Sequence, residues 1–304
     1  MCGHNYGYGK AITEGDFMIK LQDVSYVYME GGPFEKRALD KVNIEIGKGE
    51  FVGLIGHTGS GKSTLIQLLN GLLKPTEGKI IVGGHDLGDK KTKLRDIRFK
   101  VGLVMQYPEY QLFEETVFKD IAFGPSNMGL TKAEIKERVE FAANLVGLPD
   151  GILSKSPFDL SGGQKRRVAI AGVLAMEPEV LILDEPTAGL DPAGRNEILL
   201  KIKDMHKRMN LTVILVSHSM EDVARLADRI LVMNGGRVEM FDTPSRIFTH
   251  ADRMTEIGLN VPQITRITDE LRKRGFPIKE GIYTMDEALY YIKKTLSGRG
   301  VDKC

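Results

Sequence analysis

The sequence predicts an α/β fold with a parallel β-sheet at its core. Phe51–Ile55 is an apolar strand pattern that ends in a glycine-rich loop, and Ser63–Leu69 then shows the apolar spacing of a helix. Val180–Asp184 and Thr212–Ser217 are further apolar strand patterns, each followed by a helical pattern. Strands that alternate with helices are typical of βαβ units, and such units build parallel sheets.

Other parts of the chain depart from this alternation. Residues 18–50 hold short strand patterns separated by turns, which we expect to form an antiparallel β subdomain. Residues 107–176 predict a helical insertion, in which Thr131 caps a helix that has Glu134 three residues further on. Residues 241–304 are more polar and helical. We expect them to form a small C-terminal appendage that could support dimer formation.

Composition limits the possible classes of protein. The 304 residues are 42% hydrophobic and 27% charged, with a net charge of +1, so no strong field attracts nucleic acid. The apolar stretches are of strand length, so any membrane crossing would need another subunit. Two cysteines, Cys2 and Cys304, fit a reducing cytoplasm. Residues 1–17 lack an apolar region, and we expect a disordered leader before a main domain at 18–240.

The glycine-rich loop matches the phosphate-binding pattern GxxxxGK[ST], in the strand–loop–helix context that this pattern requires. Its backbone N–H groups can turn toward phosphate oxygens, and the helix N-terminus adds partial positive charge. Lys62 would contact the β- and γ-phosphates, and the Ser63 hydroxyl would bind Mg²⁺. The sequence thus predicts a P-loop NTPase. Its predicted ATP-binding residues here are Gly56, His57, Thr58, Gly59, Ser60, Gly61, Lys62, Ser63 and Thr64.

Two adjacent acids, Asp184 and Glu185, follow the strand Val180–Asp184. Adjacent carboxylates at a buried strand end are costly unless they meet a cation, and Mg²⁺ bound by Asp184 would meet this need. Glu185 would then polarise the attacking water as a general base. An acidic pair after a strand can also be a simple helix cap. The accompanying phosphate loop favours the catalytic interpretation.

A third motif opens the helix that precedes Pro178, and it consists of Leu160, Ser161, Gly162, Gly163 and Gln164. A serine and two glycines at a helix N-terminus can bind a second anion. A chain with one nucleotide loop has no evident use for a second phosphate site of its own. We therefore expect this motif to contact the γ-phosphate held by the loop of a partner subunit.

Together these motifs resemble the nucleotide-binding domain of ABC transporters, over roughly Ile19–Met240. The resemblance implies an ABC ATPase fold. It identifies the phosphate loop as Walker A, Val180–Glu185 as Walker B and Leu160–Gln164 as the signature motif. It also implies that ATP and Mg²⁺ are the ligands, and that two subunits enclose two nucleotides between them.

The same resemblance implies roles for single residues. Gln106 matches the Q-loop glutamine, which senses Mg²⁺ and couples to the membrane subunit, so the implied Mg²⁺ ligands are Ser63, Gln106 and Asp184. Asp191 matches the D-loop at the dimer interface. His218 matches the switch histidine, which contacts the γ-phosphate and completes the catalytic pair with the Walker B glutamate.

An aromatic residue shortly after the first strand stacks on adenine in this family. Tyr28 fits that spacing, and a phenol ring is suited to stacking on a purine. Tyr26 is the alternative, and we expect it on the opposite face of the strand, in the core. The prediction therefore favours Tyr28 as the adenine contact.

A narrower resemblance concerns the energy-coupling factor importers. Gln106–Phe113, Asp120–Pro125 and Leu160–Ala171 are similar to segments of their ATPases, and 261–276 is similar to the second of their two paralogous ATPases. This resemblance implies a subunit that hydrolyses ATP at the cytoplasmic face of the cell membrane. The implied partners are a second ATPase, a transmembrane coupling protein and a substrate-binding membrane subunit, with vitamins or other micronutrients as cargo.

Three alternatives remain open at this level. Relatives with a single ATPase type import cobalt or nickel, so a homodimer is possible beside the favoured paralogous heterodimer. A regulatory or nucleic-acid-linked ABC ATPase without a transport role is the third alternative. It is disfavoured because only about a hundred residues separate Walker A from the signature, without sustained heptads.

Two charged segments have both a functional and an ordinary interpretation. The acids Glu109, Glu114 and Glu115 could receive arginine-bearing helices of the coupling protein, or they could form a solvated turn. The basic run Lys90–Lys100 is predicted to be a solvated helix face rather than a nucleic-acid patch.

Overall fold

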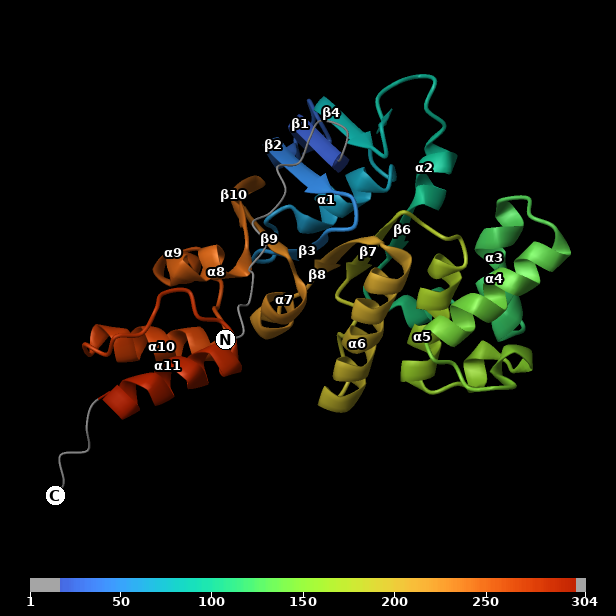
Figure 1. Ribbon diagram of the computed structural model, residues 1–304. Helices are drawn as coiled ribbons and strands as arrows, with labels where there is room; N and C mark the ends of the chain where they lie inside the picture. The colour runs from blue at the N-terminus through green and yellow to red at the C-terminus, as the bar shows by residue number, and fades with distance from the viewer. Residues whose placement is uncertain (1–16, 299–304) are drawn as a thin grey trace.

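A six-stranded sheet forms the centre of the molecule in the computed structural model, which describes residues 17–298 (Figure 1). Its strand order is β10-β9-β3-β8-β7-β6. Neighbouring strands run parallel from β9 to β6, and β10 pairs antiparallel with β9. The strands are β3 (Phe51–Ile55), β6 (Val101–Val104), β7 (Val180–Asp184), β8 (Thr212–Val216), β9 (Arg229–Asn234) and β10 (Arg237–Asp242). The predicted parallel core is confirmed.

Each central strand is buried on both faces, which explains its continuous apolar sequence. In β7, Leu181 and Leu183 point into one hydrophobic core, and Val180 and Ile182 point into the other. The first core is shared with the helical insertion and with α6 (Pro192–Met209). The second is shared with α1 (Lys62–Leu69) and the N-terminal sheet.

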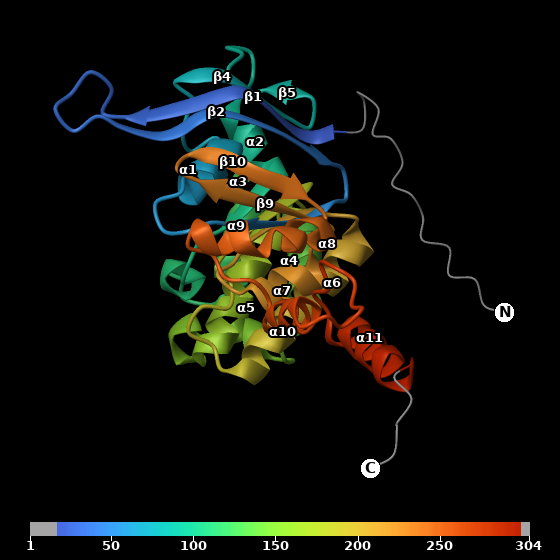
Figure 2. The same cartoon turned by 90° about the vertical axis from the view of Figure 1, so that its left-hand side faces the viewer.

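The N-terminal sheet lies above the central sheet (Figure 2). It is antiparallel, as predicted for residues 18–50, and its strand order is β2-β1-β4-β5. Its strands are β1 (Phe17–Tyr28), β2 (Lys36–Gly47), β4 (Glu77–Val82) and β5 (His85–Asp86). The described strand β1 begins at Phe17, one residue before the predicted start of the main domain at 18. Residues 1–16, which make up nearly all of the predicted leader, lie outside the described part.

The helical insertion contains α3 (Val117–Asn127), α4 (Lys132–Leu145) and α5 (Gly162–Leu174), with single 3₁₀ turns at Pro108–Gln111, Ile152–Ser154 and Pro157–Asp159. Thr131 and Glu134 form the predicted reciprocal cap of α4. Ser161 and Gln164 form the same cap at α5, which ends before Pro178. These caps satisfy N–H groups that the first helical turn leaves without partners.

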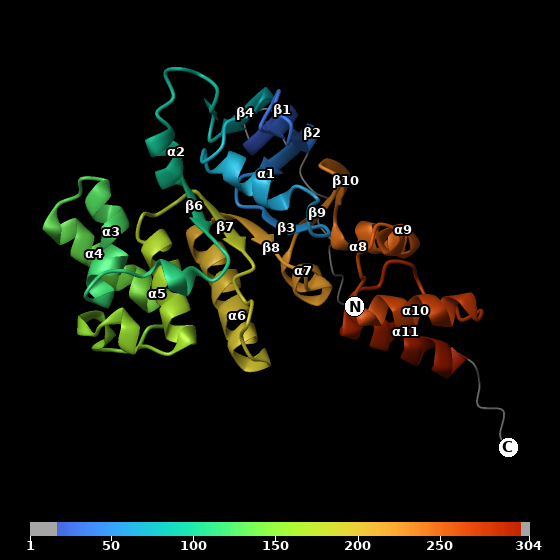
Figure 3. The same ribbon diagram turned by 180° about the vertical axis from the view of Figure 1, so that it is seen from behind.

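The C-terminal region lies on the opposite side of the central sheet from the insertion (Figure 3). Ile247, Phe248 and Met254 pack with Ile55 and Val232 of the central sheet, so this region shares a core with the main domain. Its elements are α8 (Pro244–Ile247), a 3₁₀ turn at Phe248–His250, α9 (Ala251–Glu256), α10 (Gln263–Lys273) and α11 (Met285–Gly298). No helix within residues 17–298 is long and apolar enough to cross a membrane.

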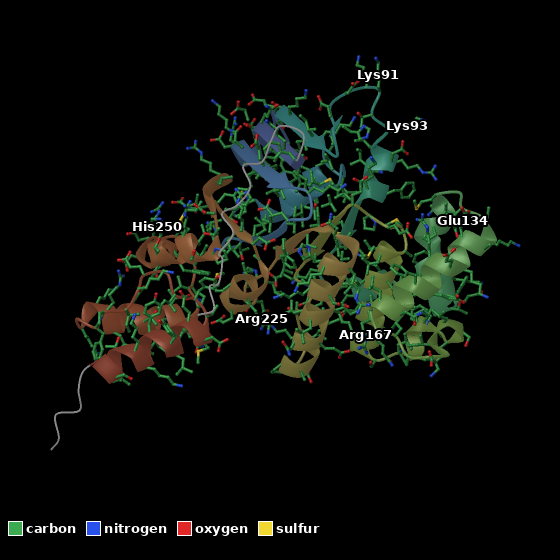
Figure 4. The ribbon with its side chains drawn as sticks, viewed as in Figure 1. Lys91, Lys93, Glu134, Arg167, Arg225 and His250 are labelled. Atoms are coloured by element: carbon green, nitrogen blue, oxygen red, sulfur yellow. The ribbon has the colours of Figure 1, made fainter. Side chains whose placement is uncertain are left out.

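Two helices remain, α2 (Leu94–Lys100) and α7 (Met220–Leu226). Only Ile97 of α2 is buried, and Lys91 and Lys93 just before it point into solvent (Figure 4). The run Lys90–Lys100 is therefore largely exposed to solvent, as predicted, but only Leu94–Lys100 is helical. That it does not bind nucleic acid stays a prediction. Cys2 and Cys304 lie outside the described residues.

We expect Leu181→Ala to lower the free energy of unfolding by about 2–5 kcal/mol, because its fully buried side chain would leave a cavity in the core. Leu200→Ala is the matched control, since Leu200 is 54% exposed on α6 and its truncation should cost less than about 0.5 kcal/mol. Urea unfolding of the purified variants measures both values. Equal losses would contradict the packing described here.

Candidate nucleotide-binding site

The carboxyl ends of four parallel strands meet at one edge of the central sheet. The glycine-rich loop follows β3, Gln106 follows β6, Asp184 and Glu185 end β7, and His218 follows β8. They open onto a cavity of about 710 Å³. Ligands bind at such strand ends in open α/β sheets. The predicted residues that line the cavity are Tyr28, Thr58, Gly59, Gly61, Lys62, Ser63, Thr64, Gln106, Asp184, Glu185 and His218.

The glycine-rich loop wraps around the N-terminus of α1. Gly61 has a φ of 103°, and a Cβ there would lie 2.7 Å from Leu39 Cδ2 and 2.8 Å from Ala38 O. Only glycine fits this close approach. Lys62 Nζ donates to the carbonyls of Gly56 and His57 at 2.6 and 3.0 Å. The loop therefore already surrounds the lysine that the sequence assigned to the phosphates.

Burial sets the charge balance around Lys62. It lowers the pKa of the Lys62 ammonium, and the nearby carboxylates of Glu185 and Asp184 oppose that effect. Burial also raises the pKa of Asp184, against the attraction of Lys62. Two acids thus share one buried cation, and this arrangement favours a further cation between them.

Glu185 is the most perturbed of these groups. Burial, and then the charge of Asp184, raise the pKa of Glu185 to about 7. Its Oε1 has no hydrogen-bond partner in the part of the chain that the structure describes, and it lies 3.6 Å from His218 Nε2. The residue also has a left-handed φ of 49°. A buried carboxyl group whose pKa lies near 7, on a residue with strained backbone, is typical of a functional site.

Three predicted loop residues, Gly56, His57 and Ser60, do not line the cavity. His57 Nε2 is 3.1 Å from Asn234 Oδ1, and its Nδ1 is 2.8 Å from Thr58 O. Ser60 is buried, and its Oγ has no hydrogen-bond partner within residues 17–298. Gly56 needs to be glycine, because a Cβ there would lie 2.4 Å from that Oγ. Gly56, His57 and Ser60 thus shape the loop, and their backbone contacts to phosphate stay a prediction.

Tyr28 lines the cavity, and its hydroxyl is 3.2 Å from Thr64 Oγ1. The expectation for Tyr26 was wrong about the face of the strand, although Tyr26 does pack against the core. The two rings meet edge to face with centroids 4.7 Å apart, because residues i and i+2 of a strand point to the same side. Tyr26 is half-buried against the core. It therefore supports the Tyr28 ring from the same face.

The signature motif does not reach this cavity. None of the described residues that line the cavity belongs to Leu160–Gln164. Ser161 is the exposed N-cap of α5, and a Cβ at Gly162 or Gly163 would meet no atom within 4 Å. This helix N-terminus is therefore open to a ligand that the chain's own phosphate loop does not hold. Asp191 is likewise exposed, and its Oδ1 caps α6 by accepting the Gly194 N–H at 2.8 Å.

The acidic turn after Gln106 differs from expectation. Glu109 forms a two-pronged ion pair with Arg166, at 2.6 and 3.1 Å, and its side chain is only 16% exposed. It is therefore not available to a partner's arginine, and that interpretation is wrong for Glu109. Glu115, just before the N-cap of α3, pairs with Lys119 in the first turn of that helix. Sequence reasoning missed Arg166, because its partner is 57 residues away and no short motif joins them.

The donor set fits Mg²⁺ together with a phosphate ligand. Residues 17–298 contain no group of three His, Cys, Asp or Glu side chains that could hold a metal ion alone. The cavity instead offers the oxygens of Ser63, Gln106 and Asp184, beside the unpartnered Oε1 of Glu185. Hard cations such as Mg²⁺ prefer oxygen ligands and commonly share them with substrate phosphates.

The family model of ABC transporters matches residues 39–188. The solved structure of cbiO1 from Clostridium perfringens, part of the ABC transporter complex cbiONQ, has a TM-score of 0.72 and 38% identity over 84% of this chain and 99% of that chain. The dimeric cassette MJ0796 bound to ADP and Pi has a TM-score of 0.66 and 32% identity over 74% and 98%. These matches define the class as ABC ATPases and confirm the predicted fold.

Curated relatives show to which family of ABC ATPases the chain belongs. A protein from Caldanaerobacter subterraneus named energy-coupling factor transporter ATP-binding protein EcfA2 is 61% identical over 280 residues, which cover 92% of this chain and 98% of that protein. A protein of the same name from Clostridium tetani is 57% identical, with 93% and 99% covered. The chain belongs to this family of energy-coupling factor transporter ATP-binding proteins.

We expect Gly61→Ala to weaken ATP binding at least tenfold, because a Cβ would collide with Leu39 and the Ala38 carbonyl beside the loop. Gly129→Ala is the matched control, since Gly129 also has a left-handed φ, of 80°, but its Cβ would meet nothing within 4 Å. Fluorescent-nucleotide titration measures both affinities. Equal affinities for the two variants would contradict the assigned phosphate loop.

Proposed function

We propose that this protein binds and hydrolyses ATP as one motor subunit of an energy-coupling factor importer. The observation that carries the proposal is the meeting of Lys62, Asp184, Glu185 and His218 around one cavity at the carboxyl edge of the sheet. Family membership supports the transport role, because the relatives are named as ATP-binding proteins of such transporters.

Hydrolysis follows from the geometry of this edge. Lys62 and the loop N–H groups hold the phosphates, and Tyr28 lies where an adenine ring can stack. Glu185 accepts a proton from the attacking water, and His218, 3.6 Å away, orients the γ-phosphate for in-line attack. Mg²⁺ held by Ser63, Gln106 and Asp184 would neutralise charge on the phosphate oxygens.

The active unit is proposed to be a dimer of ATPases. The signature helix end is exposed at Ser161 and Gly162, and it lies outside the cavity of its own chain. A partner's γ-phosphate can occupy it, and Asp191 at the exposed start of α6 would lie at the same interface. We favour a paralogous ATPase as the partner, with a second copy of this chain as the alternative.

Docking to the membrane is proposed to occur at a groove of about 410 Å³ between α3 and α5. Its lining is mostly apolar and includes the exposed rings of Phe113 and Phe123, whose centroids are 5.1 Å apart. Helices of a transmembrane coupling protein would fit there, beside Glu114 and Glu115. The ATPase would then lie at the cytoplasmic face, with the substrate-binding subunit in the membrane.

The chain divides, in this proposal, into an ATPase domain at 18–240 and an appendage at 241–304. The described part of the appendage joins the main core through α8 and α9, and α10 and α11 pack together around Ile278, Ile282 and Ala288. Such a helical pair could support contact between two ATPase subunits.

Catalysis should depend on pH through Glu185. Only the deprotonated carboxylate accepts a proton, and its pKa is raised to about 7. We therefore expect kcat/KM for ATP to be constant above pH 8 and to fall toward tenfold per unit below pH 6. Rates of the complex at saturating Mg²⁺ between pH 5.5 and 9 measure this.

Two variants serve as controls for that profile. Glu185→Gln should retain ATP binding and lose at least a hundredfold in turnover, whereas Lys62→Ala should lose the binding itself. Near-parental turnover of Glu185→Gln in the assembled complex would show that Glu185 is not the base.

Phe113→Glu should abolish co-purification of the polytopic coupling protein, because it places a charge in the apolar groove. Its ATP affinity should not change, since the groove is separate from the nucleotide cavity. Phe141→Glu, at a ring 46% exposed on α4 and outside the groove, is the matched control. Co-purification with Phe113→Glu at the parental level would rule out this docking site.

A further inference from the structure

Arg166 lies on α5, five residues after the signature serine Ser161, and its side chain is only 3% exposed. Its guanidinium makes four hydrogen bonds. Nε and Nη2 donate to the two carboxylate oxygens of Glu109 at 3.1 and 2.6 Å. Nη1 donates to the carbonyls of Pro186 and Ala188 at 3.2 and 2.7 Å. We call these four residues the Arg166 junction.

The junction joins three segments that each carry part of the site. Glu109 lies three residues after Gln106, which lines the nucleotide cavity. Pro186 and Ala188 follow Glu185 and lead into the loop that ends at Asp191. Arg166 itself lies on the helix that presents the signature. One buried cation therefore contacts the Q-loop segment, the catalytic-acid segment and the signature helix.

The backbone beside the junction is strained. Tyr107, between Gln106 and Glu109, has a left-handed φ of 53°. Its ring edge lies 3.9 Å from the position of a Cβ on Gly189. A bulky residue stays in this conformation only where its surroundings fix it, and such strain is common at functional sites. The Glu109–Arg166 pair anchors the turn directly after Tyr107.

The chemistry of the pair indicates positioning rather than general stabilisation. A buried ion pair loses its hydration, so an apolar pair of similar volume often stabilises a protein equally well. What an apolar pair cannot supply is the planar, two-pronged geometry that fixes the carboxylate, together with donors for two carbonyls. The surface pair Arg208–Asp204 has no such role, since its side chains are 68% and 45% exposed.

We propose that Arg166 is a positioning residue that holds the Q-loop segment, the Glu185–Asp191 segment and the signature helix in one fixed arrangement. The proposal rests on the function proposed above. Gln106 and Glu185 act on the chain's own nucleotide, and the signature acts on the partner's. The junction therefore transmits occupancy of one cavity to the signature that closes the other.

The test uses the complex purified from native membranes through this chain, carrying Glu109→Gln or Arg166→Lys. We expect kcat for ATP to fall at least tenfold, because each variant removes the two-pronged pair. The ATP affinity of the chain's own cavity should stay within twofold, since neither residue lines it. Asp204→Asn, in the surface pair, should leave both values unchanged. A parental kcat, or a loss explained by ATP affinity alone, overturns the proposal.

An apolar double variant separates positioning from stability. Glu109→Leu combined with Arg166→Met should fold with a cooperative thermal transition, because the buried volume is kept. Its melting temperature should fall only by the cost of the two carbonyls, of Pro186 and Ala188, that lose their donor. Its kcat should nevertheless stay at least tenfold low. Parental turnover of this variant would show a purely structural pair and overturn the proposal. If the double variant does not fold, Glu109→Gln alone tests the proposal: a parental kcat, or a loss of kcat explained by ATP affinity alone, overturns it.

The failure of this inference can be told from failure of the proposed function. Glu185→Gln in the same preparation reports on the function itself. If Glu185→Gln loses turnover while the junction variants turn over normally, only the Arg166 inference is wrong. If Glu185→Gln retains turnover, the proposed catalytic site is wrong.

Discussion

The burial of two adjacent carboxylates beside one lysine is the constraint on which the nucleotide site depends. The end of β7 brings Asp184 and Glu185 out of water, and Lys62 alone cannot balance them. Burial therefore raises the pKa of Glu185 to about 7 and leaves its Oε1 without a hydrogen-bond partner among the described residues. Binding of a cation with a phosphate would relieve this cost. The burial of these two carboxyl groups costs stability while no ligand is bound, and the same burial favours binding of a cation with a phosphate.

The position of the signature motif gives this site its dependence on a second subunit. A helix N-terminus with an exposed Ser161 cap can bind an anion, and it lies outside the cavity that its own chain builds. Closure of two subunits would bring one such end to each nucleotide. The Arg166 junction then gives a physical route between the two nucleotides. Its guanidinium contacts the segments after Gln106 and Glu185, and Arg166 itself lies on the helix that presents the signature.

Local rules explain what could be predicted from the sequence. The phosphate loop, the strand-end acids and the helix caps at Thr131 and Ser161 depend on neighbours within a few residues, and the structure has them as expected. Contacts between segments far apart in the sequence could not be predicted from such local rules. The Glu109–Arg166 pair joins residues 57 apart, so the acid appeared to be available to a partner. The error at Tyr26 was different, because strand alternation itself places it beside Tyr28.

The protonation of Glu185 in the nucleotide-free subunit tests the central constraint most directly. Carboxyl carbons can be followed by ¹³C NMR during a pH titration, and comparison with Glu185→Gln assigns the Glu185 signal. The structure predicts a midpoint at about pH 7, which should move down when a nucleotide and Mg²⁺ are added. A midpoint near 4.5, the ordinary value for glutamate, would contradict the account.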